Sequence, residues 1–459
     1  MASTTTTTAA ALDRYTAATP GSRRRYEEAL RLLPDGVSRS AAYFTPYPTF
    51  IERGSGAYLT DVDGRSILDF GNGNRSLLLG HNHPAVIDAV RQQLDRGLAF
   101  SLMSDPELEL AASLQERVPS MELMRFTASG TEATMFAVRV ARAKTSRMIF
   151  ARMGGSYHGT HDMLQVGGPN TPMFPQPGTE GEQSVGWGIP PHLREDVVYL
   201  PFNDLDGTAQ VFDEHRREIA TVIVEPTIGG GGYLPIDADY LAGLQDLCRR
   251  DGTVLVLDEM ISMGIGRGGA QGLYGVRPDL TTTGKVIGGG MPMGCFGGDA
   301  ELMRLVEWVK DDRVISGTAS SNSRTRVSHM GSFNAHPLAM AAGAAQLAAL
   351  TDDVYARLAE LGDYVRNELR ALTQRKGVTL QVTGISHLIG LTFINRPIRT
   401  IADTAGADRS FARRMELSLM SQGFNFPEGR LGCVNAAMTT ADLDSFVSAV
   451  DLAIDEAVI

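Results

Sequence analysis

Two residues near the middle of the chain have the types and the setting for cofactor chemistry, Asp258 and Lys285. Asp258 ends the run Thr-Val-Leu-Val-Leu-Asp, which is typical of a buried parallel strand that delivers its last side chain to the carboxyl edge of a sheet. Lys285 follows among small residues. A buried acid can keep a pyridine nitrogen protonated, and a lysine amine can form a Schiff base. The pair therefore predicts a pyridoxal phosphate site, beside the plainer interpretation of a strand-end cap and a surface lysine.

A short segment ahead of this pair has the features of an anion-binding site. Ala128-Ser129-Gly130-Thr131 follows a predicted strand and opens a predicted helix. Backbone N–H groups, two hydroxyls and the positive end of a helix dipole meet there, so Ser129, Gly130 and Thr131 are candidates to bind a phosphate. The alternative is an ordinary helix N-cap.

Another strand end brings an aromatic ring and an imidazole, Tyr157 and His158, to the same edge. Tyr157 is placed to stack on a flat cofactor ring. His158 and His161, like His81 and His83, have the spacing of a metal pair, but we interpret these histidines as loop or capping residues and predict no metal site.

One motif points to a different class of enzyme. The segment from Gly264 to Gly269 matches the dinucleotide fingerprint GxGxxG. That fingerprint needs a strand directly before it and a good helix after it, and this segment has neither. A nicotinamide-dependent oxidoreductase is therefore a distant alternative.

The composition is that of a globular enzyme with an acidic surface. The 459 residues are 43% hydrophobic and carry a net charge of −11, which argues against binding to nucleic acid or to anionic membranes. The chain has no apolar run of membrane-spanning length, and its three widely spaced cysteines suggest no disulfide framework. These features favour a cytoplasmic protein.

The order of elements predicts an α/β fold. From about residue 123 strands and helices alternate, which indicates a mostly parallel sheet with helices on both faces. We expect a flexible tail over 1–20, a helix and small strands over 21–75, a large cofactor-binding domain over 76–330, and a smaller α+β domain over 331–459. The Gly/Pro-rich stretch 154–195 is a candidate lid or dimer-contact loop.

Several motifs, taken in order, also resemble one known family, the class III aminotransferases of fold type I. The motifs are Ser129-Gly130-Thr131-Glu132-Ala133, Tyr157-His158-Gly159, Val224-Glu225-Pro226, Leu257-Asp258-Glu259, Thr283-Gly284-Lys285 and Gly331-Ser332-Phe333-Asn334. The resemblance runs from about residue 20 to the C-terminus.

This resemblance assigns roles to the motif residues. It implies that Lys285 holds pyridoxal 5'-phosphate and shuttles a proton, and that Asp258 pairs with the pyridine nitrogen. The remaining cofactor-binding residues implied by the motifs are Ser129, Gly130, Thr131, Tyr157, His158, Glu225 and Ser332. Ser332 stands where the family usually has a threonine that reaches the neighbouring subunit's phosphate, which implies a homodimer with shared sites.

Within the family the chain is similar to glutamate-1-semialdehyde aminomutases and to aminotransferases that act on β-phenylalanine or D-phenylglycine. Ala42 stands where the aminomutases tend to have an arginine, whereas Arg39 resembles the carboxylate clamp of the β-phenylalanine enzymes. Arg430 is a second candidate for substrate binding. We therefore expect an aminotransferase that moves an amino group from an amino acid to a keto acid, with β-amino or aromatic amino acids as candidate donors. An aminomutase or a racemase is the alternative.

Overall fold

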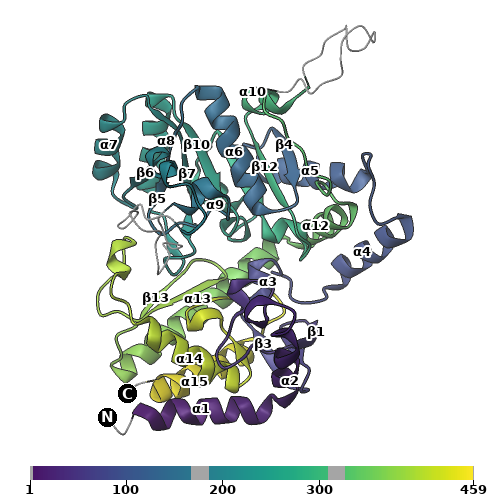
Figure 1. Ribbon diagram of the computed structural model, residues 1–459, viewed down its shortest axis with the longest axis vertical. Helices are drawn as coiled ribbons and strands as arrows, with labels where there is room; N and C mark the ends of the chain where they lie inside the picture. The colour runs from purple at the N-terminus through teal and green to yellow at the C-terminus, as the bar shows by residue number, and fades with distance from the viewer. Residues whose placement is uncertain (1–3, 167–185, 309–325, 458–459) are drawn as a thin grey trace. The chain divides into compact units, whose positions relative to one another are not determined.

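The computed structural model describes residues 4–166, 186–308 and 326–457, and the chain divides into two compact units (Figure 1). The first unit joins the N-terminal 84 residues to most of the chain after Asp353. The second unit spans Ala85–Asp352 together with Arg399–Ile401. Each unit has its own sheets and core.

The second unit is built on a seven-stranded sheet, and this confirms the predicted fold type. Six strands run parallel, and β12 alone runs antiparallel, between β4 and β11. In spatial order the strands are β4 (Leu123–Thr127), β12 (Gly294–Gly298), β11 (Leu280–Gly284), β10 (Val254–Asp258), β7 (Ile219–Val224), β5 (Ile149–Met153) and β6 (Val197–Leu200).

Helices flank this sheet, and α6 packs along one face of it (Figure 1). Phe136, Ala137 and Val140 of α6 meet buried side chains of β7, β10, β11 and β12, which places the core under this helix. The helices of the unit are α4 (Pro84–Arg96), α5 (Asp105–Arg117), α6 (Gly130–Thr145), α7 (Leu205–Glu214), α8 (Ala238–Asp251), α9 (Gly269–Tyr274), α10 (Ala300–Met303) and α12 (Pro337–Ala349). A small hairpin pairs β8 (Thr227–Ile228) with β9 (Leu234–Pro235).

The first unit combines two smaller sheets with long helices. One sheet has the order β1 (Ile51–Ser55), β2 (Tyr58–Asp61), β3 (Ser66–Asp69) and β15 (Phe424–Asn425). The other has the order β13 (Gln381–Thr383), β14 (Leu388–Thr392) and β16 (Leu431–Cys433). The helices are α1 (Thr4–Ala18), α2 (Pro20–Ala29), α13 (Asp352–Lys376), α14 (Arg409–Ser421) and α15 (Thr440–Ala457).

The N-terminal segment differs from the flexible tail that we expected over 1–20. Residues 4–18 form α1, which packs against α14 and α15. Ala11 and Tyr15 are buried, and the Tyr15 hydroxyl donates to the Tyr47 carbonyl at 2.8 Å. A threonine-rich tract has low helix propensity by itself, so tertiary packing stabilises this helix.

The division into units also differs from the expected domain boundaries. The segment 21–75 belongs with the C-terminal elements in the first unit, whereas 331–352 belongs to the second. The reason is α12, which packs against α5 and against the short helix η7 (Lys285–Gly288) within the large unit.

The described residues include no helix that is long and apolar enough to cross a membrane, and no cluster of three metal-ligating side chains. Cys248, Cys295 and Cys433 are buried free thiols. The predicted loop 154–195 lies partly outside the described residues; its described parts include η3 (Asp162–Gln165) and η5 (Pro191–Asp196).

Candidate active site

Strand register brings acidic side chains together at the carboxyl edge of the large sheet. Ile223 of β7 pairs with Val256 of β10 and lies beside Arg152 of β5. Because side chains alternate along a strand, Glu225 and Asp258, each two residues further on, point to the same face as these partners. Arg152, Glu225 and Asp258 therefore follow one another across adjacent strands.

Asp258 is surrounded by hydrogen-bond donors. Its Oδ1 accepts from the Thr282 hydroxyl at 3.0 Å and from the Met260 N–H at 3.2 Å, and its Oδ2 lies 2.7 Å from His158 Nδ1. The carboxylate is fully buried. Donors of this number stabilise the ionised form, which is the form that can pair with a protonated pyridine nitrogen.

His158 is wholly buried beside this carboxylate. Burial lowers the pKa of its imidazole and outweighs the opposite effect of the hydrogen bond to Asp258. The ring is therefore neutral, and Nδ1 carries the proton that it donates to Asp258. Within the described part of the chain Nε2 has no hydrogen-bond partner.

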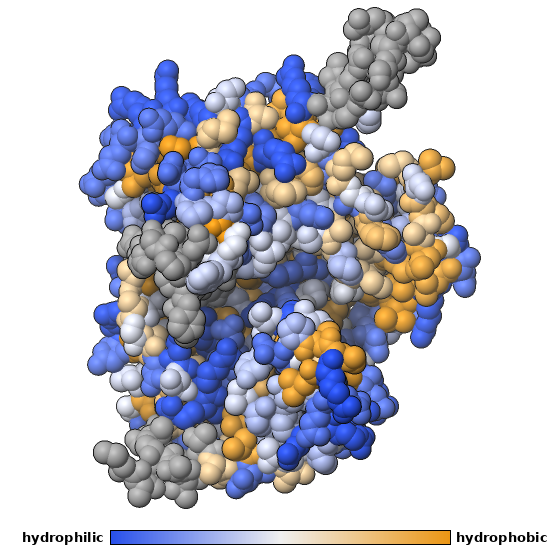
Figure 2. Space-filling model, viewed as in Figure 1, coloured by the Kyte–Doolittle hydropathy of each residue, from blue (hydrophilic) through white to orange (hydrophobic). Residues whose placement is uncertain are grey.

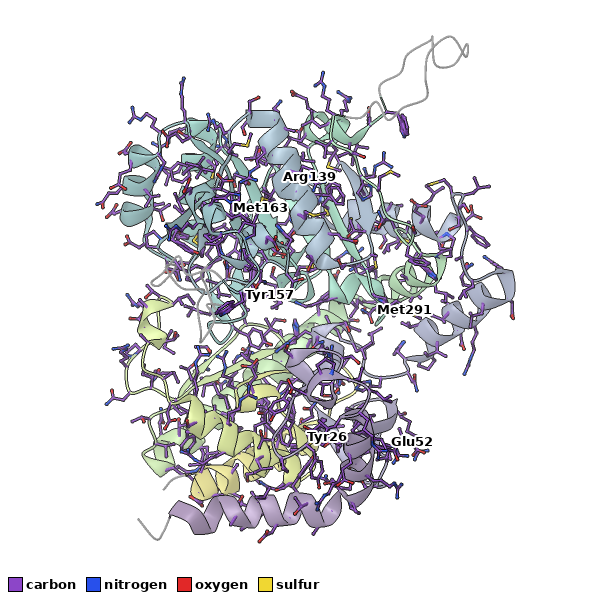
Figure 3. The ribbon with its side chains drawn as sticks, in the orientation of Figure 1. Tyr26, Glu52, Arg139, Tyr157, Met163 and Met291 are labelled. Carbon is purple, nitrogen blue, oxygen red and sulfur yellow. The ribbon has the colours of Figure 1, made fainter. Side chains whose placement is uncertain are left out.

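Glu225 is a second buried acid at the same edge. Its Oε2 accepts the N–H of Tyr157 at 2.8 Å. Burial raises the pKa of Glu225 to about 8, and the negative charge of Asp258 adds to the rise, while Lys285 acts in the opposite direction. The side chain thus fixes the backbone at Tyr157, a residue that is 42% exposed (Figure 3).

The predicted phosphate segment forms the N-terminus of α6. Ser129 is the N-cap: its hydroxyl accepts the Glu132 N–H at 3.2 Å, and the Glu132 carboxylate accepts the Ser129 N–H at 3.1 Å. This capping box leaves the first-turn N–H groups of Gly130 and Thr131, and the Ser129 hydroxyl proton, to bind an anion.

The loop that carries Tyr157 closes onto this segment. The Thr160 N–H donates to the Thr131 hydroxyl at 3.2 Å. A Cβ on Gly159 would lie 2.8 Å from the Thr131 Cα, and Gly159 has a φ of +105°, so a larger residue would push the loop away. The structure therefore holds the predicted ring-stacking and phosphate-binding residues side by side.

Lys285 follows β11 and opens η7 in a left-handed conformation with a φ of 48°. Such a conformation costs about 1–3 kcal/mol for a residue with a side chain and persists only where neighbours enforce it. Here α12 does so: a Cβ on Gly343 would lie 2.1 Å from the Ile287 carbonyl, and Gln346 donates to the Val286 carbonyl. The lysine that sequence predicts as the cofactor anchor thus sits on a strained and closely supported turn.

Met260 lies at the predicted site, although the sequence did not predict a role for it. A Cβ on Gly130 would lie 2.7 Å from the Met260 Sδ, and a Cβ on Gly284 would lie 2.8 Å from the same atom. The thioether therefore lies between the phosphate segment and the segment that precedes Lys285. Two glycines in two separate motifs were the signal that something fills this space.

The segment from Gly264 to Gly269 lacks the setting of a dinucleotide site. It leads into α9, which has six residues. The first N–H groups of α9 are already occupied, because Glu259 accepts from Ala270 N at 2.9 Å and from Gln271 N at 3.0 Å. The chain's own carboxylate takes the place that a pyrophosphate would need.

The remaining predicted residues lie elsewhere in the two units. Ser332 is exposed in the second unit, in the turn before α12. Arg39 and Arg430 belong to the first unit. Arg39 is exposed, and the half-buried Arg430 lies 3.0 Å from Glu428 through its Nε.

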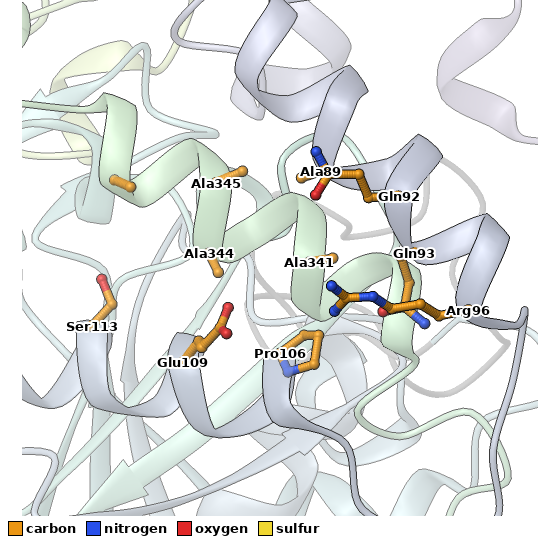
Figure 4. Close-up of a pocket in the computed structure, with 11 residues that line it drawn as sticks. Ala89, Gln92, Gln93, Arg96, Pro106, Glu109, Ser113, Ala341, Ala344 and Ala345 are labelled. Atoms are coloured by element: carbon orange, nitrogen blue, oxygen red, sulfur yellow. The ribbon is translucent and has the colours of Figure 1, made fainter.

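A separate cavity of about 450 Å³ opens in the second unit between α4, α5 and α12 (Figure 4). Its lining includes Gln92, Arg96 and Glu109, with alanines of α12 on one side. None of the predicted site residues lines it. The cavity is therefore separate from the predicted site at the sheet edge.

The donors at the sheet edge fit pyridoxal phosphate. The N–H groups at the start of α6 suit its phosphate, the Tyr157 ring suits its flat pyridine, and the ionised Asp258 suits the pyridine nitrogen. Lys285 lies close enough to this set to influence the titration of Glu225. One group of each required kind is present.

Comparison with known proteins supports the same assignment. The sequence model of the aminotransferase class-III family matches residues 40–414. The glutamate-1-semialdehyde 2,1-aminomutase of Sorangium cellulosum is 34% identical over 437 residues, covering 94% of this chain and 95% of that protein. The enzyme of the same name from Chloroflexus aggregans is 36% identical over 447 residues, covering 94% and 96%.

Solved structures extend this likeness to transaminases. An omega-transaminase from Sphaerobacter thermophilus is 36% identical, with a TM-score of 0.87 over 95% of this chain and 97% of that one. A β-phenylalanine aminotransferase from Variovorax paradoxus is 33% identical, with a TM-score of 0.84 over 97% and 96%. With the geometry of Asp258, Lys285 and the start of α6, these matches show that the chain belongs to the class-III aminotransferase family and uses pyridoxal 5'-phosphate.

Proposed function

We propose that this enzyme is an aminotransferase that moves an amino group from an amino acid, with a β-amino or aromatic amino acid as the donor class, to a keto acid. The observation that carries the proposal is Arg39, an exposed arginine that resembles the carboxylate clamp of β-phenylalanine aminotransferases, together with Ala42 at the position of the aminomutase arginine. A planar guanidinium binds both oxygens of a carboxylate. Arg430 is proposed as the second substrate-binding arginine.

Each residue of the site would have a separate role in the reaction. The bound cofactor supplies the electron sink for the carbon that loses its proton. Lys285 Nζ accepts that proton and returns it to a neighbouring position, as a general base and then a general acid. Asp258 keeps the pyridine nitrogen protonated, and the start of α6 anchors the phosphate. Tyr157 would stack on the cofactor ring, and Ser332 would reach the phosphate bound by the neighbouring copy of the chain.

An aminomutase is the second candidate, and the names of the similar aminomutases from Sorangium cellulosum and Chloroflexus aggregans favour it. Such an enzyme would rearrange one amino aldehyde without an external acceptor. A racemase would invert its substrate without net amino transfer. The same Lys285 and Asp258 would serve all three reactions, so the substrate test decides among them.

The deciding experiment uses a panel of α- and β-amino donors, each with and without 2-oxoglutarate. The proposal expects glutamate to form from 2-oxoglutarate, with β-phenylalanine or aromatic amino acids among the best donors. Arg39→Gln should raise the KM of these donors more than it lowers kcat, because it removes a carboxylate contact. Isomerisation of glutamate-1-semialdehyde, with no transfer to any acceptor, would establish the aminomutase instead.

We also propose that two copies of the chain form a homodimer. Figure 2 shows an apolar patch over α4 and α5, where six large apolar side chains are between 45% and 85% exposed: Leu94, Leu98, Phe100, Leu102, Met103 and Leu108. A patch of this kind is typical of a protein interface. Light scattering should give twice the 49.3 kDa of one chain, and Leu102→Glu with Met103→Glu should lower that mass. A monomeric wild type would contradict the proposal.

A further inference from the structure

Two carboxyl groups occupy the same buried edge of the sheet, but only one is needed to pair with a pyridine nitrogen. Glu225 directly follows β7, and Asp258 ends the neighbouring strand β10. The two residues are 3% and 1% exposed. Two acids at the ends of adjacent strands, in a site with little water, do not both ionise readily, so one carboxyl tends to keep its proton.

The donors around each acid decide which of the two is ionised. Asp258 receives two side-chain donors and one backbone donor, from His158, Thr282 and Met260. Glu225 is held by the backbone N–H groups of Tyr157 and Gly229. The stronger set surrounds Asp258, so the negative charge belongs there.

The strand on the other side of Glu225 contributes a buried cation. Arg152 is fully buried, and it donates to the Leu164 carbonyl at 2.6 Å and to the Ser156 hydroxyl at 3.3 Å. Among the described residues no carboxylate lies within ion-pair distance of this guanidinium. Its contacts fix the backbone just before Tyr157, so Arg152 and Glu225 support the same loop from two strands.

We propose that Glu225 is a positioning residue that keeps its proton in the resting enzyme: a neutral carboxyl that fixes the Tyr157 loop and leaves Asp258 as the one ionised acid beside the cofactor. This inference rests on the proposed function and on its pyridoxal phosphate site. It deepens that function because it identifies the group whose negative charge weakens cofactor binding at alkaline pH.

The titration of Glu225 follows from the groups that face it. Burial and Asp258 raise the pKa of Glu225 to about 8, and the opposing effects of Lys285 and the Tyr157 N–H are smaller. Arg152 is also close enough to interact with it. Above this pH a second negative charge appears beside Asp258. The anionic cofactor should then bind less tightly, by roughly tenfold for one added charge in a partly screened site.

The test measures the dissociation constant of pyridoxal phosphate from pH 6.5 to 9.5 for the wild type and for Glu225→Gln. Glutamine keeps an oxygen that accepts the Tyr157 N–H but cannot ionise. The ratio of the wild-type constant to the Glu225→Gln constant should rise from about one to about ten across this range. Taking the ratio cancels the titration of the free cofactor. A flat ratio overturns the proposal.

Two further variants separate positioning from mere packing. Glu225→Ala removes the acceptor of the Tyr157 N–H, so it should bind the cofactor more weakly at every pH. Glu218→Gln, an exposed acid beside the other end of β7, should behave as the wild type. If Glu225→Gln binds as weakly as Glu225→Ala at pH 7, an ionised carboxylate is required and the proposal is wrong.

A direct measurement covers the case in which Glu225→Gln does not fold. The infrared difference spectrum of the wild-type holoenzyme between pH 6.5 and 9.5 should lose a protonated-carboxyl band with a midpoint near 8, as the pKa of Glu225 requires. Absence of that loss overturns the proposal. Both readouts are independent of turnover, so failure to find an amino acceptor would count against the proposed aminotransferase and not against this role of Glu225.

Discussion

His158 Nδ1 lies 2.7 Å from Asp258 Oδ2, with both side chains fully buried. Because burial lowers the pKa of His158, the imidazole stays neutral and donates a hydrogen bond without forming an ion pair. The histidine orients the carboxylate and leaves its negative charge for another partner. This arrangement predicts how substitutions at position 158 will behave.

His158→Phe should weaken cofactor binding and lower kcat by roughly 10–100-fold, which is the usual effect of removing a group that orients a ligand-binding side chain. His158→Asn should keep most of the activity, because its amide nitrogen can take the place of Nδ1. Cofactor affinity and kcat measured together check this prediction. If His158→Phe kept its activity and His158→Asn lost it, ring packing would matter and the hydrogen bond would not.

Lys285→Ala should abolish turnover, with a loss of more than about 10⁴-fold expected when both the covalent anchor and the general base are removed. Borohydride should erase the visible band of the wild type and leave the cofactor attached to the peptide that contains Lys285. Lys144→Ala, a surface lysine paired with Glu301, is the matched control and should keep full activity. A Lys285→Ala enzyme with normal activity would refute the assignment.

Gly130→Ala should weaken cofactor binding and destabilise the protein by about 1–3 kcal/mol, because the new Cβ would lie 2.7 Å from the Met260 Sδ. Met260→Ala removes that atom, so the double variant should recover part of the loss. Gly272→Ala is the control, since nothing lies within 4 Å of its added Cβ. A double-mutant cycle on cofactor affinity and urea unfolding checks the coupling.

Gly343→Ala tests whether the packing of α12 against η7 holds the backbone of Lys285 in its conformation. Its Cβ would lie 2.1 Å from the Ile287 carbonyl, so α12 and η7 would have to separate. The turn that holds Lys285 at a φ of 48° should then relax, and kcat should fall more than cofactor affinity. Gly377→Ala, at an exposed position with no neighbour within 4 Å, controls for the added methyl group, although its φ of +63° costs about 1 kcal/mol.

His387 predicts the acid sensitivity of the first unit. It is fully buried, neither ring nitrogen has a partner among the described residues, and burial, aided by Arg366 and Arg75, lowers its pKa to about 3. A folded pKa below the ordinary 6.5 means that the unfolded chain binds more protons, so stability falls as the pH drops from 6.5 towards 3. In urea unfolding, the free energy of unfolding of His387→Leu should depend less on pH over this range than that of the wild type. His192 is exposed, so His192→Leu should keep the pH dependence of the wild type.

The parts of the site that sequence could predict are those with a strong local signal. The apolar run before Asp258 and the strand–helix junction at Ser129 each have a type of residue and a periodicity that point to one structure. The predicted local structures are confirmed: β10 ends at Asp258, and α6 begins directly after Ser129. The parallel sheet also followed from the alternation of strands and helices.

Other features depend on partners that are distant in sequence. β12 has three glycines in five residues, so it shows no strand periodicity, yet close backbone neighbours demand them: a Cβ on Gly298 would lie 2.1 Å from the Asp279 carbonyl. The helix over Thr4–Ala18 is stabilised by α14 and α15 and not by its own propensity. Likewise, the role of Met260 appears only when Gly130 and Gly284 are brought together.

The order of strands in the large sheet determines when during folding the chain can bind its cofactor. Asp258 ends β10, and Ser129, His158 and Lys285 follow β4, β5 and β11. These strands, with β12 and β7 between them, come together only through pairing of segments that are distant in sequence. Such contacts form slowly and late in folding. We therefore expect pyridoxal phosphate to bind only molecules whose sheet is complete, because the groups proposed to hold it are assembled only then. Bound pyridoxal phosphate then stabilises the folded enzyme by mass action. A shortage of pyridoxal phosphate would therefore lower the amount of folded enzyme as well as its activity.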